Sequence, residues 1–325
     1  MTKVYVSYGS NMDVTQMMER CPDARLKGRG VLRDYELVFR RSCTGFYASI
    51  DRCKGSKVPV IVWNISEDDE ASLDGYEGYP AWYDKTRVTV ELKDAPYEGE
   101  ITEAMTYVLL EDRLMGVPMP SYYNKIERAY ERFSFSIIAL KEAYVGCLMR
   151  NLQDLREERF SENEVRALVE NLVKAAIPHE GSKCFIWEAG NHRHMPGDAV
   201  YDFVKTPTAA ALGFLAFAYR YYEAPREISG IDEAISKAMN GCIACGLKNH
   251  GYSADRGFVR LMKILVECET DMLAEEWKQK NRKFFVFMKR SLDHLEELAE
   301  GEANNSWSEV NTEEVKEILA IVKGR

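Results

Sequence analysis

The chain has 325 residues, of which 46% are hydrophobic and 29% are charged, and its formal net charge is −9. This composition is typical of a globular protein long enough for two domains, and its acidic balance argues against a nucleic-acid-binding protein. The most apolar run, Ala209–Tyr219, is too short to span a bilayer, so we expect no membrane association. The chain enters a strand almost at once, without a secretory signal, and its eight cysteines lack a disulfide spacing. We therefore expect a cytoplasmic protein with reduced thiols.

The first dozen residues contain an unusual change from strand to helix. A short strand around Val4–Val6 ends in Tyr8-Gly9-Ser10-Asn11, and a helix Val14–Arg20 follows with Asp13 as its N-cap. Backbone N–H groups at a helix start lack partners, and glycine lets a ligand approach the backbone closely, so this turn could bind an anion. An ordinary capped turn would have the same sequence.

The first part of the chain reads mainly as strands. Arginines and lysines between Arg25 and Arg41 make this stretch locally basic, and we interpret it as a solvated strand face because Asp34 and Glu36 interrupt it. A capping box of Ser66 and Asp69 starts a helix over Glu67–Asp74. A second helix is expected over Tyr122–Phe133, and the expected strands are Val31–Arg41, Phe46–Asp51, Val58–Ile65, Lys85–Leu92 and Ala104–Leu110. Mostly antiparallel strands with few helices predict a small closed or half-closed β-barrel.

After about residue 136 the strand pattern gives way to helices. A connecting helix is expected over Ile137–Arg150, and a capping box of Ser161 and Glu164 starts the next helix, which ends before Pro178. Further helices are expected at Thr208–Glu223, Ile231–Leu247, Phe258–Cys268, Asp271–Glu300 and Thr312–Val322. The predicted fold class is α+β, with a barrel domain over 1–136, a connecting helix over 137–159 and a mainly helical domain over 160–325. The long Asp271–Glu300 helix also offers a surface for a homodimer.

A single carboxylate stands out in the segment SLDGYEGYPAWYDK. Glu77 lies between Tyr76 and Gly78, among Tyr, Trp and Pro residues. Apolar surroundings would raise the pKa of Glu77 and make it a proton shuttle near neutral pH. A solvent-exposed glutamate in a turn is the alternative interpretation.

Three segments together resemble the gamma-glutamylcyclotransferase-like family over about residues 1–135. They are YGSNM after the first strand, LDGYEGYPAWYDK in the middle, and PSYYNKI after the last strand. The resemblance implies a small mixed β-barrel with a pocket at one end, where backbone N–H groups hold the α-carboxylate of a γ-glutamyl group. It also implies that Glu77 is the catalytic acid/base and that the pocket residues are Tyr8, Gly9, Ser10, Asn11, Tyr83 and Tyr123. The segment before Tyr123 is one residue shorter than in some members of the family.

The resemblance implies a reaction as well as a fold. Glu77 removes a proton from the α-amine, and the amine attacks the γ-carbonyl of the same residue to form 5-oxoproline. Protonated Glu77 then gives its proton to the departing amine or amino acid. No cofactor or metal is expected, and the sequence has no Walker or dinucleotide fingerprint. The alternative is a non-catalytic protein that binds a γ-glutamyl group or small anion and acts through its helical domain as a regulatory or partner-binding module.

A C-x-x-C motif in the second half allows two interpretations. Cys242 and Cys245 could bind zinc together with His250, or with His192 and His194 from the GNHRH segment. The cysteines lie among Ala, Ile and Leu at helical spacing, where cysteine acts as a small core residue. We therefore expect buried, reduced thiols and no metal.

Overall fold

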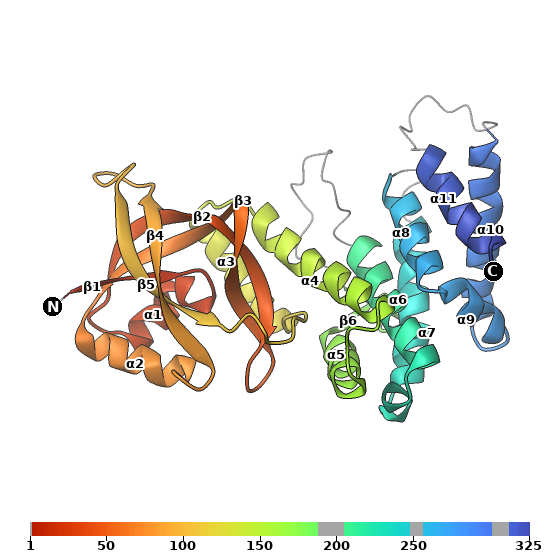
Figure 1. The fold of residues 1–325 in the computed structure, drawn as a ribbon, viewed down its shortest axis with the longest axis horizontal. Coiled ribbons are helices and arrows are strands. Elements are labelled where there is room, and N and C mark those ends of the chain that lie inside the picture. The colour runs from red at the N-terminus through yellow and green to blue at the C-terminus, as the bar shows by residue number, and fades with distance from the viewer. Residues whose placement is uncertain (1, 188–204, 248–255, 301–311) are drawn as a thin grey trace. The chain divides into compact units, whose positions relative to one another are not determined.

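The computed structural model describes residues 2–187, 205–247, 256–300 and 312–325 (Figure 1). The chain divides into two compact units, Met1–Cys147 and Leu148–Arg325, which we call the barrel unit and the helical unit. Within the described segments, no helix is long and apolar enough to cross a membrane. Helix α4 (Ile138–Arg156) covers the segment that we expected to connect two domains. The domain boundaries themselves stay a prediction.

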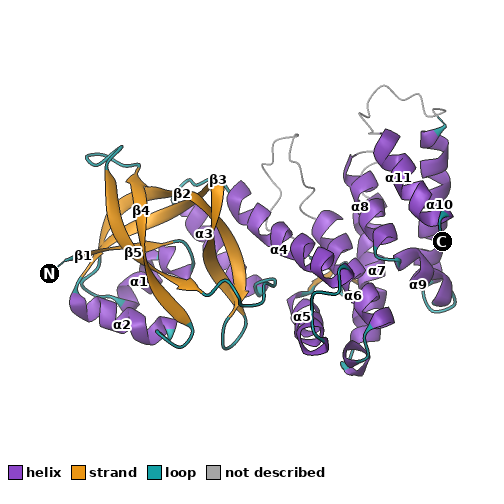
Figure 2. Cartoon of the chain, in the orientation of Figure 1, coloured by secondary structure: helices purple, strands orange, loops and turns teal. Residues whose placement is uncertain are grey.

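The barrel unit is built on a closed five-stranded barrel, in agreement with the predicted α+β fold. The strand order is β1-β3-β2-β4-β5, and every neighbouring pair is antiparallel except β1 and β5, which are parallel. Figure 2 shows these strands in orange, with helices α1, α2 and α3 beside them. The strands are β1 (Lys3–Ser7), β2 (Arg25–Arg41), β3 (Phe46–Ile65), β4 (Tyr83–Leu92) and β5 (Ile101–Leu109).

The two longest strands correct the predicted pattern. The segments expected as separate strands, Phe46–Asp51 and Val58–Ile65, are one strand, β3, which pairs with an earlier-starting β2. The pairing shifts register between Arg33 and Tyr35, where Asp34 has a φ of 60° and accepts a 2.8 Å hydrogen bond from the Gly55 N–H. A bulge at this point lets β3 continue through the polar residues after Asp51. The sequence of that stretch resembles a loop, and for this reason two separate strands were predicted.

Arg40 is a second correction, because it does not belong to a solvated strand face. Its side chain is buried and forms an ion pair with Asp51 on β3. One guanidinium nitrogen also donates to the carbonyls of Glu111 and Arg113, at 2.6 and 2.7 Å. Arg40 therefore ties the β2–β3 hairpin to the segment that follows β5.

The barrel unit also contains short helices, and the helix caps predicted for α1 and α2 are confirmed. A 3₁₀ turn, η1 (Ser10–Met12), leads into α1 (Val14–Arg20), where Asp13 caps the helix by accepting from the Gln16 N–H at 2.9 Å. The capping box of Ser66 and Asp69 starts α2. Helix α2 (Glu67–Glu77) is longer than predicted and ends at Gly78, which adopts a left-handed conformation with a φ of 67°. Helix α3 (Pro120–Arg132) follows β5.

The helical unit packs around one apolar helix. Helix α6 (Lys205–Tyr221) contacts α5, α7, α8 and α9, and nearly all its side chains from Ala209 to Ala218 are buried. The predicted capping box of Ser161 and Glu164 is present on α5 (Glu162–Ala175). The other elements are the hairpin β6 (Ile177–His179) and β7 (Cys184–Ile186), a 3₁₀ turn at Ala224–Glu227, and helices α7 (Ile231–Leu247), α8 (Arg256–Glu267), α9 (Thr270–Glu276), α10 (Arg282–Ala299) and α11 (Thr312–Lys323).

The single helix expected over Asp271–Glu300 is wrong, because α9 and α10 are separated by a turn. The Asn281 N–H donates to the Trp277 carbonyl at 2.9 Å, and the Asn281 carbonyl accepts from the first turn of α10. Trp277 packs edge-on against Tyr219 of α6, with ring centroids 5.1 Å apart. The turn therefore places Trp277 in contact with α6. Asparagine favours such turns over helix interiors. The β6–β7 hairpin was also not predicted.

Cys242 and Cys245 are buried thiols on α7, as their helical surroundings predicted. Burial raises the pKa of the Cys242 thiol well above its ordinary value. Their suggested partners His192, His194 and His250 lie outside the described residues. Within the described part of the chain, no group of three or more His, Cys, Asp or Glu side chains is arranged to hold a metal ion.

Candidate active site

A pocket of about 450 Å³ opens in the barrel unit and brings the predicted site residues together. Its wall comes from the turn after β1, from α1, from the β2–β3 hairpin, from the end of α2, from β4 and β5, and from α3. Six of the seven residues predicted from the sequence line it: Tyr8, Gly9, Ser10, Asn11, Glu77 and Tyr83. These residues come from two segments that are far apart in the chain, one around residues 8–11 and one over residues 77–83.

Tyr123 is the predicted residue that does not line the pocket. Its buried ring packs against Phe39 at a centroid distance of 6.4 Å and against Tyr144 of α4 at 5.5 Å. Its neighbour Tyr122 lines the pocket instead. One residue along a helix turns the side chain by about 100°, so Tyr122 and Tyr123 face different sides of α3. We therefore replace Tyr123 by Tyr122 in the candidate site.

Glu77 is held at the wall of the pocket by the last turn of α2. One carboxylate oxygen, Oε1, accepts a 3.0 Å hydrogen bond from Nδ2 of Asn11. Burial raises the pKa of Glu77, while the charge of Arg20 and the hydrogen bond from Asn11 act in the opposite direction. A carboxylate with a raised pKa in a pocket can take up and release a proton closer to neutral pH than an exposed one.

Asn11 is fixed by hydrogen bonds on both ends of its amide. Besides Glu77, Nδ2 donates to the Tyr5 hydroxyl at 3.0 Å. Oδ1 accepts from Arg20 at 2.6 Å and from Gln16 at 3.3 Å. Because both amide atoms are engaged and the side chain is buried, the N–H that points at Glu77 cannot rotate away.

Arg20 and Gln16 are site residues that the sequence reasoning missed. They are four positions apart on α1, and both line the pocket. The Arg20 guanidinium also lies over the Tyr76 ring, 4.5 Å from its centroid, beside Glu77. The available signal was helical spacing, because the N-cap at Asp13 sets the register in which positions 16 and 20 share one face.

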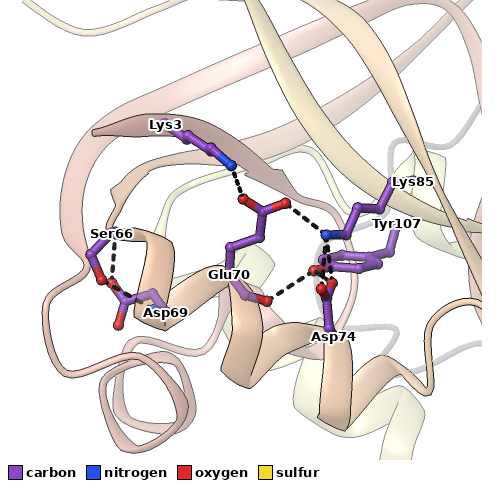
Figure 3. Close-up of polar contacts among 7 residues, drawn as sticks. All are labelled: Lys3, Ser66, Asp69, Glu70, Asp74, Lys85 and Tyr107. Carbon is purple, nitrogen blue, oxygen red and sulfur yellow. Dashed lines mark hydrogen bonds and ion pairs between the residues drawn. The ribbon is translucent and has the colours of Figure 1, made fainter. Parts of the chain in front are cut away.

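Ion pairs attach α2 to the outside of the barrel (Figure 3). Glu70 lies between Lys3 of β1 and Lys85 of β4, and Lys85 also contacts Asp74, with nitrogen–oxygen distances of 2.6 Å to Glu70 and 2.7 Å to Asp74. The Tyr107 hydroxyl on β5 donates to Asp74 at 2.6 Å. Three strands therefore hold the helix whose last residue is Glu77.

Aromatic side chains form much of the remaining wall. The Tyr122 hydroxyl accepts from the Ala48 N–H at 3.2 Å, and its ring meets Tyr47 edge-on with centroids 4.9 Å apart. Burial raises the pKa of the Tyr8, Tyr83 and Tyr122 phenols above the ordinary value. These phenols therefore stay neutral and can donate hydrogen bonds throughout the physiological pH range.

The sequence of this region matches a known family. Residues 5–124 match the family model described as gamma-glutamyl cyclotransferase, AIG2-like. Over these residues the barrel unit is similar to that family. The match ends within α3, and the helical unit lies outside it.

Several solved structures are similar to part of this chain, at low sequence identity. A protein titled gamma-glutamyl cyclotransferase is 23% identical, with a TM-score of 0.38, over 41% of this chain and 80% of its own. An uncharacterized protein from Homo sapiens is 25% identical, with the same TM-score of 0.38 and the same coverage of 41% and 80%. YkqA from Bacillus subtilis is 24% identical, with a TM-score of 0.36, over 42% of this chain and 50% of its own. No curated protein matches the sequence.

Proposed function

We propose that the barrel unit converts a γ-glutamyl group to 5-oxoproline and releases an amine or amino acid. The observation that carries this proposal is the state of Glu77. This carboxylate lines the pocket, burial raises its pKa, and a fixed amide orients it. A glutamate in a solvent-exposed turn would have none of these properties, so the geometry favours the catalytic interpretation of Glu77.

The substrate's own ammonium group is the first reactant. In the proposed reaction, N–H groups of the Tyr8–Asn11 turn bind the α-carboxylate, and this places the α-ammonium group against Glu77. The ionised Glu77 accepts one proton, which leaves a neutral amine with a free electron pair. That nitrogen attacks the γ-carbonyl carbon and closes a five-membered ring. Because the reaction is intramolecular, the pocket mainly selects the folded-back conformer.

Collapse of the intermediate needs a proton on the departing nitrogen. Protonated Glu77 supplies it, the γ-carbonyl re-forms, and the bond from the γ-carbon to that nitrogen breaks. The ring nitrogen still carries a second proton after its attack; the ionised Glu77 takes up this proton and passes it to the released amine, so that neutral 5-oxoproline and an ammonium ion leave. We assign the neutral phenols of Tyr83 and Tyr122 as donors for the negative charge that develops on the γ-oxygen. Both line the same pocket as Glu77. The scheme is balanced without a cofactor or a metal.

The test is release of 5-oxoproline from a panel of γ-glutamyl compounds. The panel contains a γ-glutamyl-amino acid, a γ-glutamyl-alkylamine and ε-(γ-glutamyl)lysine, each with an N-acetylated counterpart whose blocked amine cannot attack. We expect stoichiometric 5-oxoproline and free amine from at least one unblocked compound and none from its blocked form. Binding of these compounds without any release would instead favour the non-catalytic alternative.

A further inference from the structure

The charge of the pocket differs from that of the whole protein. The chain carries a net charge of −9, yet the charged side chains that line the pocket are one carboxylate, Glu77, and two cations, Arg20 and Lys125. A ligand entering the pocket therefore meets a local excess of positive charge. Low-dielectric walls strengthen this effect relative to open solvent.

The two cations are not equivalent, because only Arg20 is engaged by the protein. Arg20 donates to Asn11 and lies over Tyr76. Lys125 is exposed, and among the residues that the structure describes it has no hydrogen-bond or ion-pair partner. It lies on α3 one turn after Tyr122, whose hydroxyl borders the turn at Gly9. Lys125 is thus available to a ligand at the rim.

The bound γ-glutamyl half leaves Lys125 without a role. In the proposed function, the α-carboxylate meets backbone N–H groups and the α-amine meets Glu77, so both charges of that half are already matched. The remaining charge at Lys125 faces the other half of the substrate. No second carboxylate among the described residues lines the pocket to receive a positively charged leaving group.

We propose that Lys125 binds a carboxylate on the leaving half of the substrate. This inference rests on the proposed function and names its substrate class: γ-glutamyl amino acids or peptides, rather than γ-glutamyl polyamines or alkylamines. Lys125 is then a specificity-determining residue that contributes to binding and takes no part in proton transfer. An exposed ion pair of this kind contributes at most modestly, so we expect about a fivefold effect.

A matched pair of substrates isolates the carboxylate. γ-Glutamyl-alanine and γ-glutamyl-ethylamide differ only by that group, and γ-glutamyl-putrescine adds a positive charge instead. For the full chain we expect kcat/KM to be about fivefold higher for the alanine compound than for the ethylamide, and lowest for the putrescine compound. The difference should lie in KM and shrink as salt is added, because salt screens exposed charges.

Variants of Lys125 test whether this residue causes the preference. Lys125→Gln should bring the ratio of the two kcat/KM values close to one, Lys125→Arg should keep the ratio, and Lys125→Glu should reverse it. Arg128→Gln is the matched control, because it removes a positive charge from an exposed position on α3 that does not line the pocket. This control should keep the wild-type ratio.

The possible outcomes separate the inference from the proposed function. Release of 5-oxoproline with equal kcat/KM for the matched pair, or a ratio that Lys125→Gln does not change, overturns the inference and leaves the function standing. Absence of release from every compound overturns the proposed function and this inference with it. A ratio that follows the charge at position 125 supports both.

Discussion

The two units differ in what they bury. The charged side chains that are buried in the described segments all belong to the barrel unit: Arg40, Asp51, Asp69 and Lys141. In the described part of the helical unit, the buried polar side chains are neutral: Asn151, Asn171, Thr206, Thr208, Thr270 and Ser291. Burying a charge costs several kcal/mol unless it is paired, and a pair contributes little net stability over apolar packing. The barrel unit therefore contains buried charges that packing alone would not require, and it is also the unit that contains the pocket.

The largest expected effect is the loss of activity on removing the pocket carboxylate. Glu77→Gln should lower kcat for 5-oxoproline release by about 10²–10⁴-fold, because the amide cannot transfer a proton. Since burial raises the pKa of Glu77, its ionised form destabilises the fold, so the melting temperature at pH 7 should not fall. Any gain should disappear as the pH falls through the pKa of Glu77. Glu19→Gln, on an exposed position of α1, is the control; a Glu77→Gln rate above a tenth of wild type would contradict us.

The next effect tests the buried ion pair directly. Arg40→Met leaves Asp51 buried without its partner and two backbone carbonyls without a donor, which should destabilise the barrel unit by about 3–5 kcal/mol. Calorimetry should show this loss in the barrel transition. Arg33→Met, which breaks the more exposed pair with Glu91, should cost at most about 1 kcal/mol. Equal losses of unfolding free energy in the two variants would show that the cost of breaking an ion pair does not depend on its burial.

Both units use the same helix cap, and removing it should give equal, smaller effects. Ser66→Ala and Ser161→Ala each remove a hydroxyl that accepts from the backbone N–H three residues on. Each should cost about 1 kcal/mol of unfolding free energy in its own unit. Serine-to-threonine variants keep the hydroxyl and serve as controls. A loss confined to one unit would show that the cap adds little to the stability of the other.

The smallest expected change is a shift in pH dependence. Arg20 lowers the pKa of Glu77 against the effect of burial, so Arg20→Met should raise that pKa further. The base must be ionised to act, so more of the enzyme is inactive at a given acidic pH. The acidic limb of kcat/KM should therefore move to higher pH. Arg25→Met, outside the pocket, should leave it in place; a limb that moves to lower pH would exclude this role for Arg20.

Features encoded by neighbouring residues were predictable from the sequence. The caps at Asp13, Ser66 and Ser161 depend on side chains within three residues of the helix start. Six pocket residues were identified through two of the three motifs of the family resemblance, YGSNM and LDGYEGYPAWYDK. The barrel itself was predicted from mostly antiparallel strands with few helices.

Features set by pairing across the fold were not predictable from the sequence. The burial of Arg40 depends on Asp51, which lies on the neighbouring strand β3 and is not adjacent in the chain. The continuity of β3 depends on a bulge around Asp34, and polar residues there read as a loop. Tyr122 and Tyr123 differ only in which side of α3 they occupy. Each of these features depends on contacts with residues that are far away in the sequence.

Two glycines of the pocket should differ in how freely they vary over evolutionary time. A Cβ added at Gly9 would lie 3.1 Å from the Tyr122 hydroxyl and 3.3 Å from the Ala48 side chain, so any larger residue would displace the tyrosine. A Cβ added at Gly75 within α2 meets nothing within 4 Å, and alanine there would favour the helix by about 1 kcal/mol. In a library of single substitutions, position 75 should accept several residues with activity retained. Position 9 should accept almost none, although both glycines border the same cavity.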